Sequence, residues 1–261
     1  MSTKQEWLTK QTLKVHTAID DNLEEWLKRV NYQYDVVFET LQDELKKVLK
    51  EFHRSAITRD RLEARYTVLT MQAQQRANEI GLELAEQMPA KLKEYANLSY
   101  EGMSEILKKS NAFANSLPSY SIEFAAGFQY EEYNFQSSIF RSGIRLGDKL
   151  NKILSEGLAK GWNMAKYAKE LKKVTDFTTY EANRIARTET ARVANEGNKR
   201  AFREYGVERV EWVASLEKRT CERCAALHTK KFILGQEPPL PLHPHCRCVL
   251  VPVLEDSNVK Y

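Results

Sequence analysis

The sequence predicts an α+β fold, in which an elongated N-terminal helical bundle precedes a mostly helical domain that ends in short β-strands. Apolar residues at helical spacing dominate the first half of the chain, further helical patterns follow, and apolar residues alternate with charged ones only after residue 206. The 261 residues are 42% hydrophobic and include only 10 Gly and 7 Pro, so the chain can bury a core and is neither disordered nor collagen-like.

The N-terminal pattern predicts three helices. Apolar residues recur every three or four positions from Leu8 to Phe52, which predicts one helix of roughly 45 to 50 residues. A second helix is expected over 62–88, ended by Pro89 because proline interrupts helix interiors, and a third over 90–114. We interpret the apolar stripe as the core of an antiparallel bundle, and the alternative is an interaction stalk for a larger assembly.

A segment containing Pro and Ser over 117–127 interrupts the helical pattern and indicates a domain linker. The predicted organisation is therefore an N-terminal helical bundle or stalk at 1–120, a linker at 121–136 and a C-terminal domain at 137–261.

Local signals divide the C-terminal domain into helices and strands. Thr178 and Glu181 have the spacing of a capping box, Gly206 is a natural helix end, and Pro252 makes the last strand an edge strand. Gly157 and Gly161 predict a turn. Helices are expected at 139–158, 163–171 and 178–206, and strands at 210–214, 231–234 and 249–254.

Charge is unevenly distributed along the chain. Residues 1–136 carry 17 Lys and Arg against 21 Asp and Glu, whereas residues 137–261 carry 23 against 15. This split predicts two surfaces with different partners. No stretch approaches the roughly 18 consecutive apolar residues of a membrane span, and charged residues occur throughout the first thirty positions, so we expect synthesis in a cytoplasm and no membrane partner.

The cysteines predict a metal site. Cys221, Cys224, Cys246 and Cys248 lie within one 28-residue stretch, and the pair Cys221-x-x-Cys224 is matched by His243-x-x-Cys246. Two such pairs suit a four-coordinate zinc-ribbon-like site, and four protein ligands close the shell, which favours structural zinc.

The choice of ligands stays open at this stage. Cys248 competes with Cys246 as a ligand, and His228 and His245 are also near. A buried cluster without metal is one alternative. A disulfide to Cys248 is another, which a cytoplasmic origin disfavours.

The sequence lacks residues that the two catalytic interpretations of this region would require. A zinc deaminase would need His-x-Glu and Pro-Cys-x-x-Cys, and neither occurs. The string from Leu242 to His245 resembles part of a His-Asn-His nuclease, but the chain has no Asp-His pair and no downstream Asn-His signature. We therefore predict no enzymatic activity and no catalytic residues, with a zinc-stabilised His-type nuclease as the alternative.

A second constellation lies in the long charged helix. Helix interiors rarely gain from threonines, yet two occur close together in this one. One interpretation is a solvated helix face, and the other is that Arg187 and Glu189 make buried polar contacts that hold the helix against the zinc-bound hairpin. The motif consists of Arg187, Thr188, Glu189 and Thr190.

Further along this helix, Arg192, Lys199 and Arg203 fall on one side and form a candidate nucleic-acid contact. Glu196 partly neutralises this stripe, and a merely solvated face is the common alternative.

The order of these motifs resembles the Mu F-like head-morphogenesis family of tailed phages. The resemblance spans roughly 137–254 and implies a minor capsid component, not a hydrolase, that acts in head assembly and in genome packaging or ejection at the portal vertex. The motifs are Ile185-Ala186-Arg187-Thr188-Glu189-Thr190, then Trp212, then Cys221-x-x-Cys224, then His243-Pro244-His245-Cys246-Arg247-Cys248.

For this chain, the resemblance implies synthesis in a bacterial host and location in the virion, inside the capsid at the portal vertex. Its implied partners are the portal protein, other capsid proteins and phage DNA, with no small-molecule substrate. The acidic helical region would reach the portal, and the basic zinc-stapled domain would face DNA or the capsid lumen. A DNA-binding protein acting during packaging is a further alternative. One departure is His245, where a small polar residue such as Asn is expected, so that His245 competes with His243 as a ligand.

Overall fold

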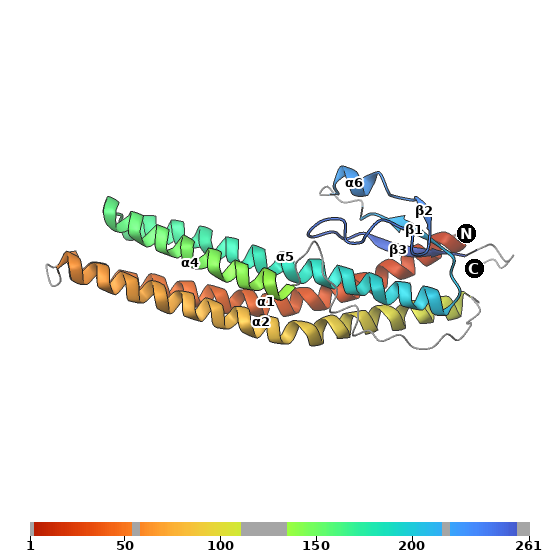
Figure 1. Cartoon of the computed structure of the whole chain (residues 1–261), viewed down its shortest axis with the longest axis horizontal. Coiled ribbons are helices and arrows are strands. Elements are labelled where there is room, and N and C mark those ends of the chain that lie inside the picture. Colours follow the sequence, from red (N-terminus) through yellow and green to blue (C-terminus); the bar gives the residue numbers. More distant parts are fainter. Residues whose placement is uncertain (1–2, 54–57, 111–134, 216–219, 255–261) are drawn as a thin grey trace. The chain divides into compact units, whose positions relative to one another are not determined.

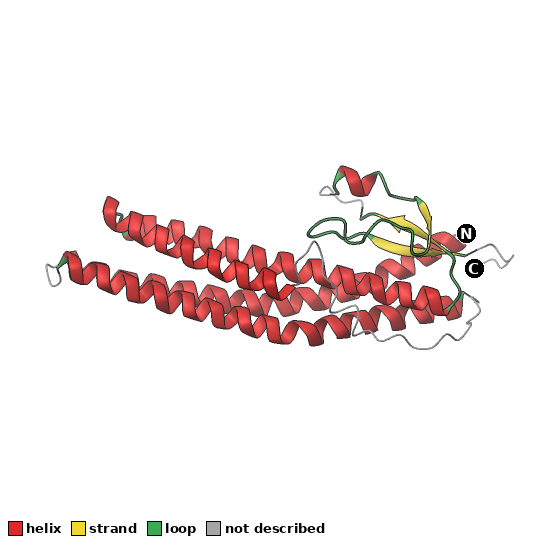
Figure 2. Ribbon diagram, in the orientation of Figure 1, coloured by secondary structure: helices red, strands yellow, loops and turns green. Residues whose placement is uncertain are grey.

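The computed structural model describes residues 3–53, 58–110, 135–215 and 220–254 and confirms the α+β class (Figures 1 and 2). Long helices make up most of it, and a small antiparallel sheet lies near the C-terminus. The helices are α1 (Lys4–His53), α2 (Arg59–Lys109), α4 (Phe135–Lys160), α5 (Met164–Glu204) and α6 (Glu222–Ala225), and the strands are β1 (Arg209–Val213), β2 (Lys231–Ile233) and β3 (Val249–Val253).

The described chain forms two compact units, and α1, α2 and α5 each contribute to both. The first unit draws on Met1–Glu24, Met88–Gln129 and Ala186–Tyr261, and the second on Glu25–Gln87 and Tyr130–Ile185. Both units therefore combine segments that precede and follow the linker predicted at 121–136, whose residues up to 134 lie outside the described part of the chain.

Helix α1 confirms the prediction of one long N-terminal helix. A capping box starts it: the backbone N–H of Thr3 donates to the Glu6 carboxylate at 2.9 Å, and the N–H of Glu6 donates to the Thr3 hydroxyl at 3.1 Å. The helix then continues for 50 residues, with its apolar stripe buried.

The prediction that Pro89 ends a helix is wrong, because α2 continues through it to Lys109. Pro89 itself is exposed, so water can reach the carbonyl that loses its backbone donor. The apolar stripe is not interrupted, since Leu84, Met88 and Leu92 are all buried. Burial of three large side chains offsets the roughly 3 kcal/mol that proline costs inside a helix.

The capping box predicted at Thr178 and Glu181 is also wrong, because α5 is one helix of 41 residues. The Thr178 hydroxyl donates to the carbonyl of Val174 at 2.9 Å, one turn back, and so is satisfied inside the helix. Glu181 instead accepts hydrogen bonds from Arg145 on α4 at 2.7 Å and from Arg184 at 3.2 Å.

The hairpin between α4 and α5 in the second unit contains the turn predicted at Gly157 and Gly161. Gly161 has a φ of +62°, and the side chain of Asn163 accepts the N–H of Lys166 at 3.0 Å as the N-cap of α5. A Cβ at Gly157 would lie 2.3 Å from the ring of Tyr167, so only glycine permits this approach of the two helices.

In the first unit, the sheet packs on helices. Its strand order is β2-β1-β3, all antiparallel, with Val210 opposite Pro252 in the edge strand β3, as predicted. Trp212 of β1 is fully buried in a core that also contains Leu8 of α1, Met103 of α2 and Phe202 of α5. Gly206, with a φ of +67°, ends the α5 segment and turns the chain into β1.

The three helices of the first unit also share a buried polar network. The Asn198 side chain on α5 donates to His16 Nε2 on α1 at 2.8 Å and accepts from the Ser99 hydroxyl on α2 at 2.6 Å. At the adjacent residue of α5, a Cβ at Gly197 would lie 2.3 Å from the carbonyl oxygen of Ala96, so α5 and α2 are in direct backbone contact there. Among the described residues, no helix combines the length and apolar character needed to cross a membrane.

Burial lowers the pKa of His16 from 6.5 to about 4. Between these values the unfolded chain binds a proton that the folded chain does not, so stability falls as the pH drops. We expect His16 to remove about 2 kcal/mol from the unfolding free energy between pH 7 and pH 5. Urea unfolding followed by circular dichroism should show a smaller loss for His16→Gln than for the wild type, and equal losses would contradict this role.

Candidate metal centre

The first half of the centre is the turn that starts α6. Cys221 is the N-cap of this helix, and its sulfur accepts the backbone N–H of Cys224 at 3.4 Å. This bond brings the two cysteines of the Cys-x-x-Cys motif onto one side of the turn. Cys224 is buried, whereas Cys221 remains partly exposed.

The second half is a tight turn before β3. The N–H of Cys246 donates to the carbonyl of His243 at 3.2 Å, with Pro244 and His245 at the two central positions. His245 has a φ of +60°. Proline followed by a residue with positive φ is the pattern of a type II turn, which favours Gly or Asn at the second position. Histidine also enters this region more often than most residues.

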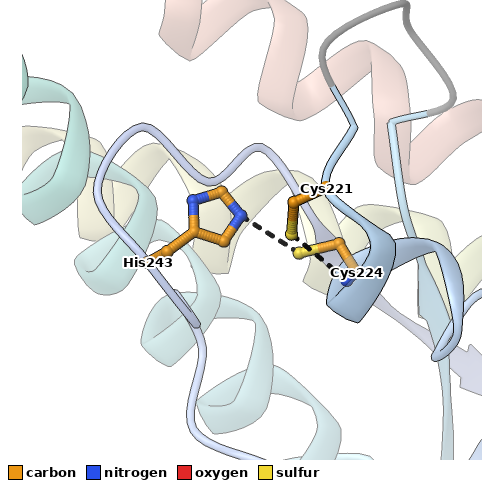
Figure 3. Close-up of side chains that lie close together, drawn as sticks. All are labelled: Cys221, Cys224 and His243. Atoms are coloured by element: carbon orange, nitrogen blue, oxygen red, sulfur yellow. Dashed lines mark hydrogen bonds between the residues drawn. The ribbon is translucent and has the colours of Figure 1, made fainter.

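The two turns bring cysteine and histidine side chains together. His243 Nε2 lies 3.2 Å from the sulfur of Cys224, and the sulfurs of Cys224 and Cys246 are 3.8 Å apart. Figure 3 shows the imidazole of His243 facing the sulfur of Cys224, with Cys221 beside it. The ligand atoms form two triplets that share Cys224, each within 4.8 Å: Cys221, Cys224 and His243, and Cys224, Cys246 and Cys248.

The donor set fits a metal ion. Ligands at about 2.3 Å in a tetrahedron place their sulfurs about 3.8 Å apart, which matches the Cys224–Cys246 separation. His243 Nδ1–H donates to the carbonyl of Pro244 at 2.8 Å, which leaves the Nε2 lone pair directed at the sulfurs. A backbone carbonyl that fixes the second nitrogen is typical of histidine ligands. These groups could therefore hold a metal.

Without an ion, protons are shared unequally among the thiols. A hydrogen bond from Cys248 lowers the pKa of Cys246 to about 5, and that same bond raises the pKa of Cys248. Burial raises the pKa of Cys224 to about 12, while the N–H of Cys224 lowers the pKa of Cys221. A bound cation would stabilise the thiolate form of its ligands in place of these protons.

The other two histidines of this region belong to neither triplet. His228 Nδ1 accepts the backbone N–H of Ala214 at 3.2 Å, which ties the segment after α6 to the end of β1. The backbone of His245 is turned toward α5, where its N–H donates to the Thr188 hydroxyl at 3.2 Å.

One face of α5 holds the segment that carries the Cys/His cluster, and the sequence did not predict most of these contacts. Besides Thr188, the Asn195 side chain bonds the carbonyl of Cys248 and the N–H of Leu250, and Lys199 pairs with Glu237 at 3.0 Å. The available signal was the placement of an asparagine, a poor helix former, two turns beyond Thr188.

The motif Arg187 to Thr190 is buried or nearly so, which argues against a solvated face. Arg187 pairs with Glu24 on α1, and Glu189 pairs with Arg192 on α5 itself at 3.0 Å. Thr188 makes a hydrogen bond to the turn that carries His243 and Cys246. Thr190, two residues further along α5, is also buried.

The basic stripe expected to meet nucleic acid is not an exposed surface. The Arg192 side chain is 5% exposed and paired with Glu189, and the Lys199 side chain is 12% exposed between Glu196 and Glu237. Of the three predicted residues, only Arg203 is exposed. Arg192 and Lys199 are thus covered by their ion-pair partners, and a nucleic-acid contact of this stripe stays a prediction.

The comparisons with known proteins place these features in a family. Residues 148–251 match the family model described as phage Mu protein F like protein. Over these residues, the chain is similar to the phage Mu F-like family. The match contains all of α5, the Cys-x-x-Cys turn and the turn before β3, as the resemblance predicted. No curated protein and no solved structure matches the chain.

The match covers 104 of the 261 residues and indicates similarity to phage head-morphogenesis proteins over that part of the chain. This family is a structural one associated with head morphogenesis.

The positive φ of His245 leads to a testable expectation. His245→Gly should stabilise the turn by roughly 1 kcal/mol because glycine adopts this backbone conformation without strain. His245→Asn should be tolerated, whereas His245→Val should destabilise the chain. Thermal unfolding of the three variants checks the order, and a valine variant as stable as the glycine variant would contradict the strain.

Proposed function

We propose that the chain is a minor head protein of a tailed phage or prophage, made in the bacterial host cytoplasm and placed inside the capsid at the portal vertex. The observation that carries this proposal is the Mu F-like match over 148–251. The matched range includes both the buried α5 motif and the cluster of Cys and His side chains that could hold a metal. The proposed role is structural, in head morphogenesis and in genome packaging or ejection, with no catalytic step.

The proposed partners are the portal protein, other capsid proteins and phage DNA. The excess of acidic residues over 1–136 supports a protein contact for the N-terminal helices, and the excess of basic residues over 137–261 supports a DNA contact. Because the α5 stripe is covered, DNA would meet the exposed lysines of the α4–α5 hairpin. These include Lys152, Lys160, Lys172 and Lys173.

We further propose a structural zinc ion held by Cys221, Cys224, His243 and Cys246. The two Cys/His turns, the Cys224–Cys246 separation and the fixed tautomer of His243 support this assignment. Cys248 then donates its thiol hydrogen to the thiolate of Cys246. The ion would link α6 to the turn before β3, a region with few regular backbone hydrogen bonds (Figure 2).

Purified protein should contain about one zinc per chain by elemental analysis, because four protein ligands close a tetrahedral shell. Cys221→Ser and Cys246→Ser should lose most of the metal and unfold at lower temperature. Cys248→Ser should keep the metal at reduced affinity.

The matched control is His228→Gln, which alters a nearby imidazole outside both triplets and should keep full metal content. Metal loss in this control, or full occupancy in Cys221→Ser, would contradict the ligand assignment.

The virion role is tested by mass spectrometry on purified particles from the producing strain. We expect the chain at low abundance relative to the major capsid protein, and we expect its deletion to yield heads with defective DNA content. Absence from particles, together with metal-dependent nicking of plasmid that His245→Ala abolishes, would favour the nuclease alternative.

A further inference from the structure

The face of α5 that meets the Cys/His segment makes two contacts with its backbone. Thr188 and Asn195 are seven residues apart, close to two helical turns, so they lie on the same side of the helix. Both are buried, and Asn195 has no exposed surface.

The Asn195 side chain makes hydrogen bonds to the backbone of β3 that a neighbouring strand would otherwise make. Its Nδ2 donates to the carbonyl of Cys248 at 3.3 Å, and its Oδ1 accepts the N–H of Leu250 at 3.2 Å. Leu250 lies opposite Trp212 in the sheet, and the Trp212 N–H and carbonyl bond Lys230 and Thr229, away from β3. The backbone groups at Cys248 and Leu250 therefore belong to the free edge of β3, and the asparagine amide satisfies both.

Thr188 holds the other end of the segment. Its hydroxyl oxygen accepts the N–H of His245 at 3.2 Å, at the left-handed position of the turn. Cys246 lies between these two fixed points, and its sulfur is the one that faces Cys224 at 3.8 Å. Rotation of the backbone on either side of Cys246 would move this sulfur away.

We propose that Thr188 and Asn195 are positioning residues for the metal centre, which hold the backbone of residues 245–250 so that the Cys246 thiolate faces the ion. This inference rests on the proposed metal centre. It assigns a role to the threonine of the α5 motif that the family match leaves without one. It also explains why two poor helix formers occupy the middle of a buried helix, where an unpaired backbone group would cost about 1 to 3 kcal/mol.

The chain offers a matched control for Asn195. Asn198, one turn further along α5, is also fully buried and also makes two side-chain hydrogen bonds, but its partners are His16 on α1 and Ser99 on α2. Replacing either asparagine by alanine removes the same atoms from the same helix. Only the Asn195 change touches the metal-binding segment.

The experiment titrates the full-length apo protein and its variants with Co²⁺ and then competes the bound ion with Zn²⁺ and a chelator. Asn195→Ala and Thr188→Val should weaken metal affinity by roughly 10- to 100-fold and alter the thiolate-to-cobalt absorption bands. Asn198→Ala should lower thermal stability in the metal-free protein and leave the cobalt spectrum and affinity within about threefold of the wild type. Thr188→Ser, which keeps the accepting oxygen, should bind like the wild type.

Each outcome decides between defined alternatives. If the wild type binds neither Co²⁺ nor Zn²⁺, the proposed metal centre and this inference both fail. If the wild type binds but Asn195→Ala and Asn198→Ala behave alike, the metal centre stands and the positioning role is wrong. If Asn195→Ala does not fold, the comparison of Thr188→Val with Thr188→Ser decides, because equal affinities for these two variants would also overturn the proposal.

Discussion

The structure of the first unit depends on the burial of a polar helix face. Between residues 186 and 202, the residues of α5 are buried or partly buried, including threonine, asparagine, glutamate and arginine. A buried polar group without a partner costs about 1 to 3 kcal/mol, so each must find one specific partner. Asn195 bonds the edge of β3, Asn198 bonds α1 and α2, and Glu189 bonds Arg192.

These polar contacts make the packing specific in a way that apolar contacts alone would not. Apolar side chains can slide past one another at modest cost, whereas a displaced amide leaves two hydrogen bonds unmade. Gly197 adds a steric constraint, since its missing side chain lets α5 touch the backbone of α2 at Ala96. The register of α5 against its neighbours is therefore determined at several adjacent positions.

The segment that follows α5 and contains the Cys/His cluster, residues 205–254, shows why such anchoring matters. Its regular structure is limited to three short strands and the four-residue helix α6, which bury little area on their own. The segment is joined to α5 by Thr188, Asn195 and Lys199, and its own two turns are joined through Cys224, His243 and Cys246. The contacts with α5 and the contacts among the Cys/His side chains constrain the same few residues from opposite sides.

The sequence by itself determined those features whose cause lies within a few residues. Apolar spacing predicted α1, Gly206 marked the end of α5, Pro252 marked an edge strand, and the cysteine spacing predicted a cluster that could hold a metal. Each of these signals acts through local backbone geometry or through a short turn, so neighbouring residues suffice to predict it.

Only the tertiary structure decided the features whose cause lies far away in the chain. Pro89 and Thr178 have local preferences for ending or starting a helix, and in both cases packing along a longer helix prevails. Arg192 and Lys199 look like an exposed basic stripe in the sequence, but in the structure they pair with Glu189 and Glu237 and are largely buried. Asn195 has no evident role until β3 lies beside it. A single helix face does not encode what covers it, because its partners are up to 182 residues distant along the chain.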